Sequence, residues 1–219
     1  METPDLTVAV QDYLKAIYAL ESEGERVTTS ALAGRVGVSA PSATAMTKRL
    51  AELGLVERAP YRGVALTDEG RAGALEVIRH HRLLERYLVD RLGLSLDEVH
   101  AEAELLEHAL SEELEAKIDA ELGYPTHDPH GDPIPDADLR VEYAPHRTLA
   151  DVEEGQQASV TRVPDGDPEL LRYLDDLSLV PGSDVEVVSL APFAGPVTVR
   201  TTSGEYAISR ELASRISTS

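Results

Sequence analysis

The sequence predicts a mainly α fold with small β elements: a winged helix-turn-helix, a helical middle domain and a small C-terminal β-barrel. Three observations predict it. Apolar residues recur at helical intervals through the first half of the chain, a proline-rich connector follows at 124–145, and strand-like alternation begins near residue 148. We therefore expect domains at 1–70, 71–140 and 151–219, with a linker at 141–150.

In the first domain, apolar spacing predicts a helix over 12–22, and potential N-caps predict two more over 28–36 and 39–53. Gly37 lies in the short turn between the second and third helices. Helix, tight glycine-containing turn and helix form the helix-turn-helix pattern. This domain is therefore expected to present its third helix as a recognition helix.

A hairpin wing is predicted next, from short strands at 55–58 and 64–67. The segment 26–66 has six basic and two acidic residues, a local charge of +4, which suits contact with phosphate. The alternative is a winged-helix module that binds protein. For DNA binding, the expected residues are Arg35, Ser39, Pro41, Ser42, Thr44, Thr47, Lys48, Arg49 and, at the tip of the hairpin, Arg62.

The composition excludes several other classes of protein. The 219 residues include no cysteine, so disulfides and thiolate metal ligands are absent. No apolar run is long enough to span a membrane and no signal segment is visible, so we expect a cytoplasmic protein. The formal net charge of −20 would repel nucleic acid if it were spread evenly, which makes the basic segment informative.

Two long helices are predicted in the middle domain. The first covers 68–92, and the second begins at an Asp97 cap and carries apolar residues at helical intervals as far as Ile118. Both are expected to contribute to a dimer interface. The C-terminal part is expected to contain strands at 158–163, 184–190 and 197–202, and a helix at 168–179.

Histidine and glutamate also follow helical spacing in the middle domain. His100, Glu104, Glu107 and His108 lie at i, i+4, i+7 and i+8, and His81 and Glu85 form a second i, i+4 pair. Such pairs also occur on solvated helix faces, but two sets on helices that pack together favour a metal site. Carboxylate and imidazole ligands suit Mn²⁺ or Fe²⁺ better than Cu(I), although Zn²⁺ and Co²⁺ also bind them. A metal hydrolase is the alternative from another class, but no nucleophile motif accompanies these residues.

Several ordered strings resemble one family across nearly the whole chain. They are DYLKAIYAL, VSAPSATAMTKRLAELGLV, YRGVALTDEGR, HHRLLERYL, VHAEAELLEHALSEELE and PHGDPIP, with PELLRYLDDLSLVPGSDVEVV in the tail. The chain resembles the diphtheria-toxin-repressor family of metal-dependent transcription regulators, whose C-terminal domain is SH3-like, also called FeoA-like. The resemblance implies a homodimeric repressor of metal homeostasis genes that binds a palindromic double-stranded operator.

The resemblance also implies ligands at two metal sites. The primary set would be Asp12, Glu104, Glu107 and His108. The ancillary set would be His81, Glu85, His100, Asp128 and His130, with Asp165 or Asp167 from the third domain. Asp128 stands where the manganese-type members have the cysteine of a Cys-Pro-His segment.

The choice of metal depends on a few of these positions. The iron-responsive branch has Met and Cys where this chain has Asp12 and Glu104, so the resemblance favours Mn²⁺ over Fe²⁺. Lys15 replaces the extra glutamate of the two-domain manganese regulators, which argues against their closely spaced binuclear cluster. A repressor that answers to Fe²⁺, and a winged-helix regulator that needs no metal, are the alternatives.

Overall fold

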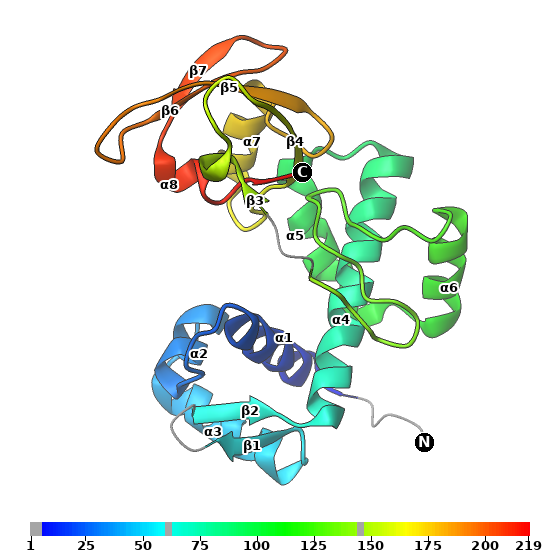
Figure 1. The fold of residues 1–219 in the computed structure, drawn as a ribbon. Coiled ribbons are helices and arrows are strands. Elements are labelled where there is room, and N and C mark those ends of the chain that lie inside the picture. The colour runs from blue at the N-terminus through cyan, green and yellow to red at the C-terminus, as the bar shows by residue number, and fades with distance from the viewer. Residues whose placement is uncertain (1–5, 60–62, 144–146) are drawn as a thin grey trace. The chain divides into compact units, whose positions relative to one another are not determined.

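The computed structural model describes residues 6–59, 63–143 and 147–219 (Figure 1). The chain divides into two compact units. The first contains Met1–His80, Glu107–Leu110 and Pro135–Arg140, and the second contains His81–Leu106, Ser111–Ile134 and Val141–Ser219.

The first unit contains the predicted winged helix-turn-helix. Its elements are α1 (Val8–Ser22), α2 (Thr29–Val36), α3 (Ala40–Glu52), β1 (Val56–Ala59) and β2 (Gly63–Leu66). The Thr28 side chain caps α2 and the Ser39 side chain caps α3, while Gly37 has a φ of 73° in the turn between them. The predicted helices and strands are confirmed here to within a few residues.

Gly63 fixes the wing against the helices. Its φ is 91°, and a Cβ at this position would lie 2.2 Å from the Val27 carbonyl oxygen, so only glycine fits. The next amide, of Val64, donates to the same carbonyl at 3.0 Å. The buried apolar residues of this unit include Leu14, Ile17, Leu32, Ala43, Leu50 and Leu66.

The middle helices differ from the prediction in one respect. α4 (Asp68–Tyr87) continues into a π-helical turn over Leu88–Leu92, as expected for one long helix. The single helix predicted after Asp97 is wrong, because the chain forms α5 (Leu96–Leu106), a 3-10 turn (Glu107–Ala109) and α6 (Glu112–Glu121). The Ser111 hydroxyl accepts from the Leu114 amide and so starts a new helix, whereas Asp97 lies in the first turn of α5.

The C-terminal part contains a six-stranded antiparallel sheet with the order β3-β8-β4-β5-β6-β7. Its elements are β3 (Arg147–Thr148), a 3-10 turn (Leu149–Asp151), β4 (Gln157–Arg162), α7 (Pro168–Asp176), β5 (Asp184–Leu190), β6 (Val197–Arg200), β7 (Glu205–Ile208), α8 (Arg210–Ala213) and β8 (Ser217–Thr218). Residues of the sheet and of α7 together form a buried apolar core. The predicted closed barrel is not seen: within the described residues, β3 and β7 remain unpaired edges of an open sheet.

Candidate metal centres and nucleic-acid interface

A fully buried group of potential ligands lies in the second unit. Glu85 comes from α4, and Asp128 and His130 come from the proline-rich segment that follows α6. One ligand atom from each lies within 4.8 Å of the others. Within the described part of the chain, Glu85 Oε2, Asp128 Oδ2 and His130 Nδ1 have no hydrogen-bond partner. Three buried polar atoms of this kind are costly unless a cation or another group satisfies them.

The local backbone explains how the segment aims these atoms. Asp128 Oδ1 accepts from the amides of His130 and Asp132, each at 2.9 Å, so the carboxylate closes a tight turn with one oxygen and leaves the other facing inward. His130 Nε2 lies 3.0 Å from the Leu96 carbonyl oxygen, to which it donates. The lone pair of a neutral His130 is therefore on Nδ1, which lies 3.5 Å from Glu85 Oε2.

The pKa values of Glu85, Asp128 and His130 are all shifted, and at least one of the other two side chains contributes to each shift. Burial would raise the pKa of Glu85, but the imidazoles of His100, His130 and His81 lower that pKa well below its usual value. Burial and the neighbouring Glu85 carboxylate raise the pKa of Asp128 to about 7. Burial would lower the pKa of His130, but Glu85 outweighs it and raises this pKa to about 9. The donor atoms and their charges fit a divalent cation.

A second group adjoins Glu85 in the same unit. Glu85 Oε1 lies 2.9 Å from His81 Nε2 and 3.1 Å from His100 Nδ1. A carboxylate oxygen of Glu104 lies 3.9 Å from His81 Nδ1 and 3.8 Å from His100 Nε2. Ligand atoms of His81, His100 and Glu104 lie within 4.8 Å of one another. The structure therefore brings Glu104 together with two residues of the predicted ancillary set.

A third group lies in the first unit and contains three of the four residues of the predicted primary set. Asp12 comes from α1, and Glu107 and His108 come from the 3-10 turn after α5. His108 Nε2 lies 3.0 Å from Asp12 Oδ1 and 3.4 Å from Glu107 Oε1. Glu104 belongs to the other unit, so its membership of this set stays a prediction.

Two neighbours of this third group were not predicted as site residues. Lys15 Nζ donates to both carboxylate oxygens of the buried Glu107, at 3.1 and 2.9 Å. Gln11 Oε1 lies 2.8 Å from His108 Nδ1, which orients the ring so that Nε2 faces Asp12. Gln11 is adjacent to Asp12 in the sequence, and this adjacency is the signal that indicates a residue able to orient a ligand.

Asp165 and Asp167, the two candidate metal ligands from the third domain, have different surroundings. Asp167 is the N-cap of α7 and accepts from the amides of Glu169 and Leu170. That role leaves its carboxylate engaged at the helix start. Asp165, three residues after β4 ends, is half-buried and stays the candidate from this domain.

The predicted DNA-binding residues lie on the exposed side of α3 and around it. Ser39, Pro41, Ser42, Thr44, Lys48 and Arg49 are exposed, and Thr47 is half-buried. The Thr44 and Thr47 hydroxyls donate to carbonyls of their own helix, and Ser39 Oγ lies 2.8 Å from Ser42 Oγ. Arg35 pairs with Glu23 at 2.6 Å, and Arg62 lies outside the described residues.

A groove runs between α3 and the wing. Its volume is about 1150 Å³. Among the residues that line it are Arg26, Thr28, Thr29, Pro41, Thr44, Thr47, Lys48 and Gly63. Glu52 and Glu57 also line the groove. Its hydroxyl and cationic side chains are of the kinds that contact a phosphate backbone.

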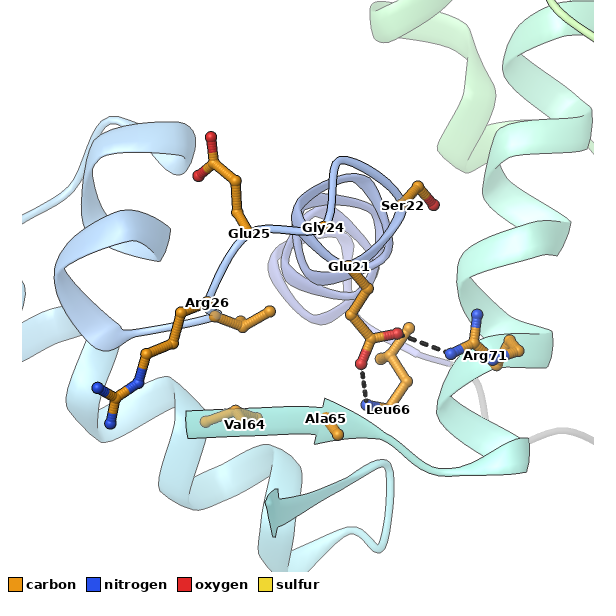
Figure 2. Close-up of a pocket in the computed structure, with 10 residues that line it drawn as sticks. Glu21, Ser22, Gly24, Glu25, Arg26, Val64, Ala65, Leu66 and Arg71 are labelled. Atoms are coloured by element: carbon orange, nitrogen blue, oxygen red, sulfur yellow. Dashed lines mark hydrogen bonds and ion pairs between the residues drawn. The ribbon is translucent and has the colours of Figure 1, made fainter. Parts of the chain in front are cut away.

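Figure 2 shows a second hollow, of about 570 Å³, where α1 ends beside the wing. Glu21 Oε1 accepts from the Leu66 amide at 3.0 Å, and Glu21 Oε2 pairs with Arg71 at 2.7 Å. One carboxylate therefore joins the end of α1 to β2 and to the beginning of α4.

Three family models match consecutive parts of the chain. They describe the iron-dependent repressor N-terminal DNA-binding domain at residues 5–64, the iron-dependent repressor metal-binding and dimerisation domain at 67–136, and the FeoA domain at 147–218. The iron-dependent repressor IdeR of Mycobacterium tuberculosis is 36% identical over 195 residues, which cover 84% of this chain and 85% of that protein. This chain belongs to the diphtheria toxin repressor family. It is a family of DNA-binding, metal-dependent transcriptional repressors and not of enzymes.

Solved structures agree with this membership of the family. A manganese-dependent transcriptional repressor in complex with manganese superposes with a TM-score of 0.85 at 43% identity and covers 95% of this chain and 98% of its own. ScaR with bound Zn²⁺ has a TM-score of 0.79 at 31% identity, with 96% and 98% covered. Among the helices of the described residues, none is both long and apolar enough to cross a membrane.

Proposed function

We propose that this chain is a Mn²⁺-activated repressor that binds operator DNA as a homodimer. The observation that carries the proposal is the set of buried atoms Glu85 Oε2, Asp128 Oδ2 and His130 Nδ1, which lack hydrogen-bond partners among the described residues. A bound divalent cation would supply the positive charge and the coordination that these atoms require. Repression, DNA binding and metal dependence are properties of the family to which the chain belongs.

The donor set supports Mn²⁺ as the activating ion. The ligands that we propose for the buried centre are carboxylate oxygens and one imidazole, and the chain contains no cysteine. Hard oxygen donors suit Mn²⁺ and Fe²⁺ and give softer ions less advantage. Raw affinity at such sites favours Fe²⁺, so the selection of Mn²⁺ depends on geometry. A repressor that answers to Fe²⁺ is the second candidate, because IdeR relatives are named as iron-dependent.

The group in the first unit connects metal to the DNA-binding elements. Asp12 belongs to α1, so ligands at Asp12, Glu107 and His108 would hold this helix against the 3-10 turn. Glu21, at the other end of α1, contacts both β2 and α4. A fixed α1 therefore also fixes the wing. Glu104 is proposed as the fourth ligand of this primary site, as the family resemblance implies.

The proposed function also includes a mode of DNA binding and a dimer. We infer that α3 enters the major groove, because its N-terminal side chains are small and exposed. Leu105, Leu106 and Leu114 are large apolar residues that are 74%, 43% and 50% exposed, which favours burial in a dimer. Two recognition helices related by a two-fold axis read a palindromic operator. We also infer a location in the cytoplasm, and we propose domains at 1–70, 71–140 and 151–219 with a linker at 141–150.

The test is a titration of the promoter region of the protein's own gene under four conditions. They are chelator, Mn²⁺, anaerobic Fe²⁺ and Zn²⁺. We expect high-affinity binding with Mn²⁺ and weak binding with chelator, and a Glu85→Gln variant should require more Mn²⁺. Equal binding under all four conditions would show a regulator that needs no metal, and a response to Fe²⁺ at lower concentration than to Mn²⁺ would favour the second candidate.

A further inference from the structure

The end of β4 lies directly against the ligand segment of the buried centre. The Val163 amide donates to the His130 carbonyl oxygen at 2.9 Å. At Gly131, whose φ is 93°, a Cβ would lie 2.0 Å from the Thr161 carbonyl oxygen and 2.8 Å from the Arg162 Cα. The two backbones are therefore in contact with no room for a side chain.

A buried carboxylate joins the same strand to α4. Asp132 pairs with Arg162 Nε at 2.9 Å and with an Arg82 guanidinium nitrogen at 3.4 Å. Arg82 also donates to the Pro133 carbonyl oxygen at 2.5 Å. Arg82 lies three residues before Glu85, on the same helix. Asp132 is thus the shared partner of two cations, one from the helix that carries Glu85 and one from β4.

We propose that Arg162 and Val163 position His130 as a ligand of the buried centre. The proposal rests on the function proposed above, since it concerns the same metal site. A metal ligand must be held within about 0.5 Å of its productive place, and outer contacts do this. The His130 ring is held by the Leu96 carbonyl and its backbone by Val163, while Arg162 holds the turn through Asp132.

Because binding free energies are coupled reciprocally, bound metal must also affect the contact between β4 and the ligand segment. If β4 improves the affinity of the buried centre for metal, bound metal must strengthen the contact of β4 with the ligand segment by the same free energy. The FeoA-like domain is then a positioning element for the buried centre, and not only a donor of a further ligand. Its effect on affinity is carried by a backbone hydrogen bond and one arginine.

The first experiment measures Mn²⁺ affinity in the full chain. A His108→Ala background weakens the site in the first unit, so that the buried centre dominates the titration. We expect Arg162→Met to lower Mn²⁺ affinity about tenfold or more, and Arg162→Lys to recover most of the loss. Arg200→Met is the matched control, since Arg200 is 48% exposed, compared with 41% for Arg162, and pairs with Glu186 and Glu205, which belong to none of the candidate ligand groups.

The second experiment is amide hydrogen exchange at Val163. In the wild-type chain Mn²⁺ should slow this exchange severalfold. Two substituted chains then serve as comparisons, and the slowing should disappear in Arg162→Met and in Glu85→Gln. Unchanged affinity in Arg162→Met, or exchange at Val163 that ignores Mn²⁺, would overturn the proposal. A Glu85→Gln chain that binds as many ions as wild type would instead remove the buried centre, so the two failures are distinguishable.

Discussion

At the scale of the residue, Asp128 determines the chemical character of the buried centre. Its carboxylate offers a hard oxygen to a bound cation, and Oδ1 closes the turn while Oδ2 lies near Glu85 and His130. The residue thus combines a structural role with a proposed ligand role. A substitution can separate the two.

The substitution Asp128→Cys should change the preference between ions. A thiolate favours Zn²⁺ and Cd²⁺ over Mn²⁺, so we expect the Zn²⁺ to Mn²⁺ affinity ratio to rise about tenfold. A competition titration of the two ions, monitored with a chromophoric chelator, measures the ratio. Asp119→Cys is the control, because Asp119 is also buried but belongs to no group of candidate ligands among the described residues. Equal ratios in wild type and Asp128→Cys would contradict a ligand role for residue 128.

The same residues predict the pH dependence of metal binding. The pKa of His130 is raised to about 9 and that of Asp128 to about 7, and metal requires both in their deprotonated forms. Affinity for Mn²⁺ should therefore rise with pH, about tenfold per unit between pH 7 and 9, and more steeply below pH 7. Calorimetry in two buffers of different ionisation enthalpy counts the protons released. Binding without proton release at pH 8 would contradict the raised pKa of His130.

At the scale of the element, the end of α1 is attached to the wing by one side chain. Glu21→Ala removes an acceptor from the Leu66 amide and an ion pair from Arg71 (Figure 2). We expect a loss of about 1–3 kcal/mol in the free energy of unfolding and weaker operator binding, with unchanged metal stoichiometry. Urea denaturation and operator titration measure the two effects. Glu25→Ala in the same hollow is the control, because Glu25 is exposed.

The exposed cations of α3 predict the salt dependence of DNA binding. Arg49→Ala should weaken binding to all sequences and reduce the log-log salt slope by about 0.9 if Arg49 contacts a phosphate. Ser42→Ala should leave the slope unchanged and alter sequence preference. Fluorescence anisotropy at several salt concentrations gives the slopes, with Lys117→Ala on α6 as the control. An unchanged slope in Arg49→Ala would remove the phosphate contact.

How far each element was predictable depended on the range of the interactions that form it. The caps at Thr28 and Ser39 are local, so the helix-turn-helix followed from spacing alone. The break between α5 and α6 did not, because the apolar period continues through it and the Ser111 cap competes with helix continuation. The short edge strand β3 also has too few residues to show a period of two.

At the scale of the whole molecule, the candidate metal ligands could be predicted from the sequence, but the way in which they group could not. Motif resemblance identified Glu85, Asp128 and His130 as candidates, although they are far apart in sequence. Resemblance did not separate Glu85, Asp128 and His130 from His81 and His100, or reveal the partners of Asp132. Those groupings depend on how the proline-rich segment returns to α4, which neither periodicity nor composition encodes.

Removal of the third domain tests how the domains divide the work. A chain ending at Arg140 should still dimerise and bind operator with metal, since the relevant residues precede that point. It should lose Mn²⁺ affinity at the buried centre, because the His130 carbonyl oxygen no longer accepts a hydrogen bond from the Val163 amide. Analytical ultracentrifugation and metal titration check both expectations. A folded truncated chain that is monomeric at micromolar concentration would contradict the assignment of the dimer interface to the middle helices.

The sulfur-free ligand set has a consequence for the conditions under which the proposed sensor works. A thiolate ligand can be oxidised through sulfenic to sulfinic acid, and the site is then lost until it is repaired or resynthesised. Carboxylates and imidazoles do not enter that sequence of reactions, and this chain has no cysteine. The buried centre of Glu85, Asp128 and His130 should thus keep its ligands during oxidative stress. Its response reports the supply of metal independently of the redox state of cellular thiols.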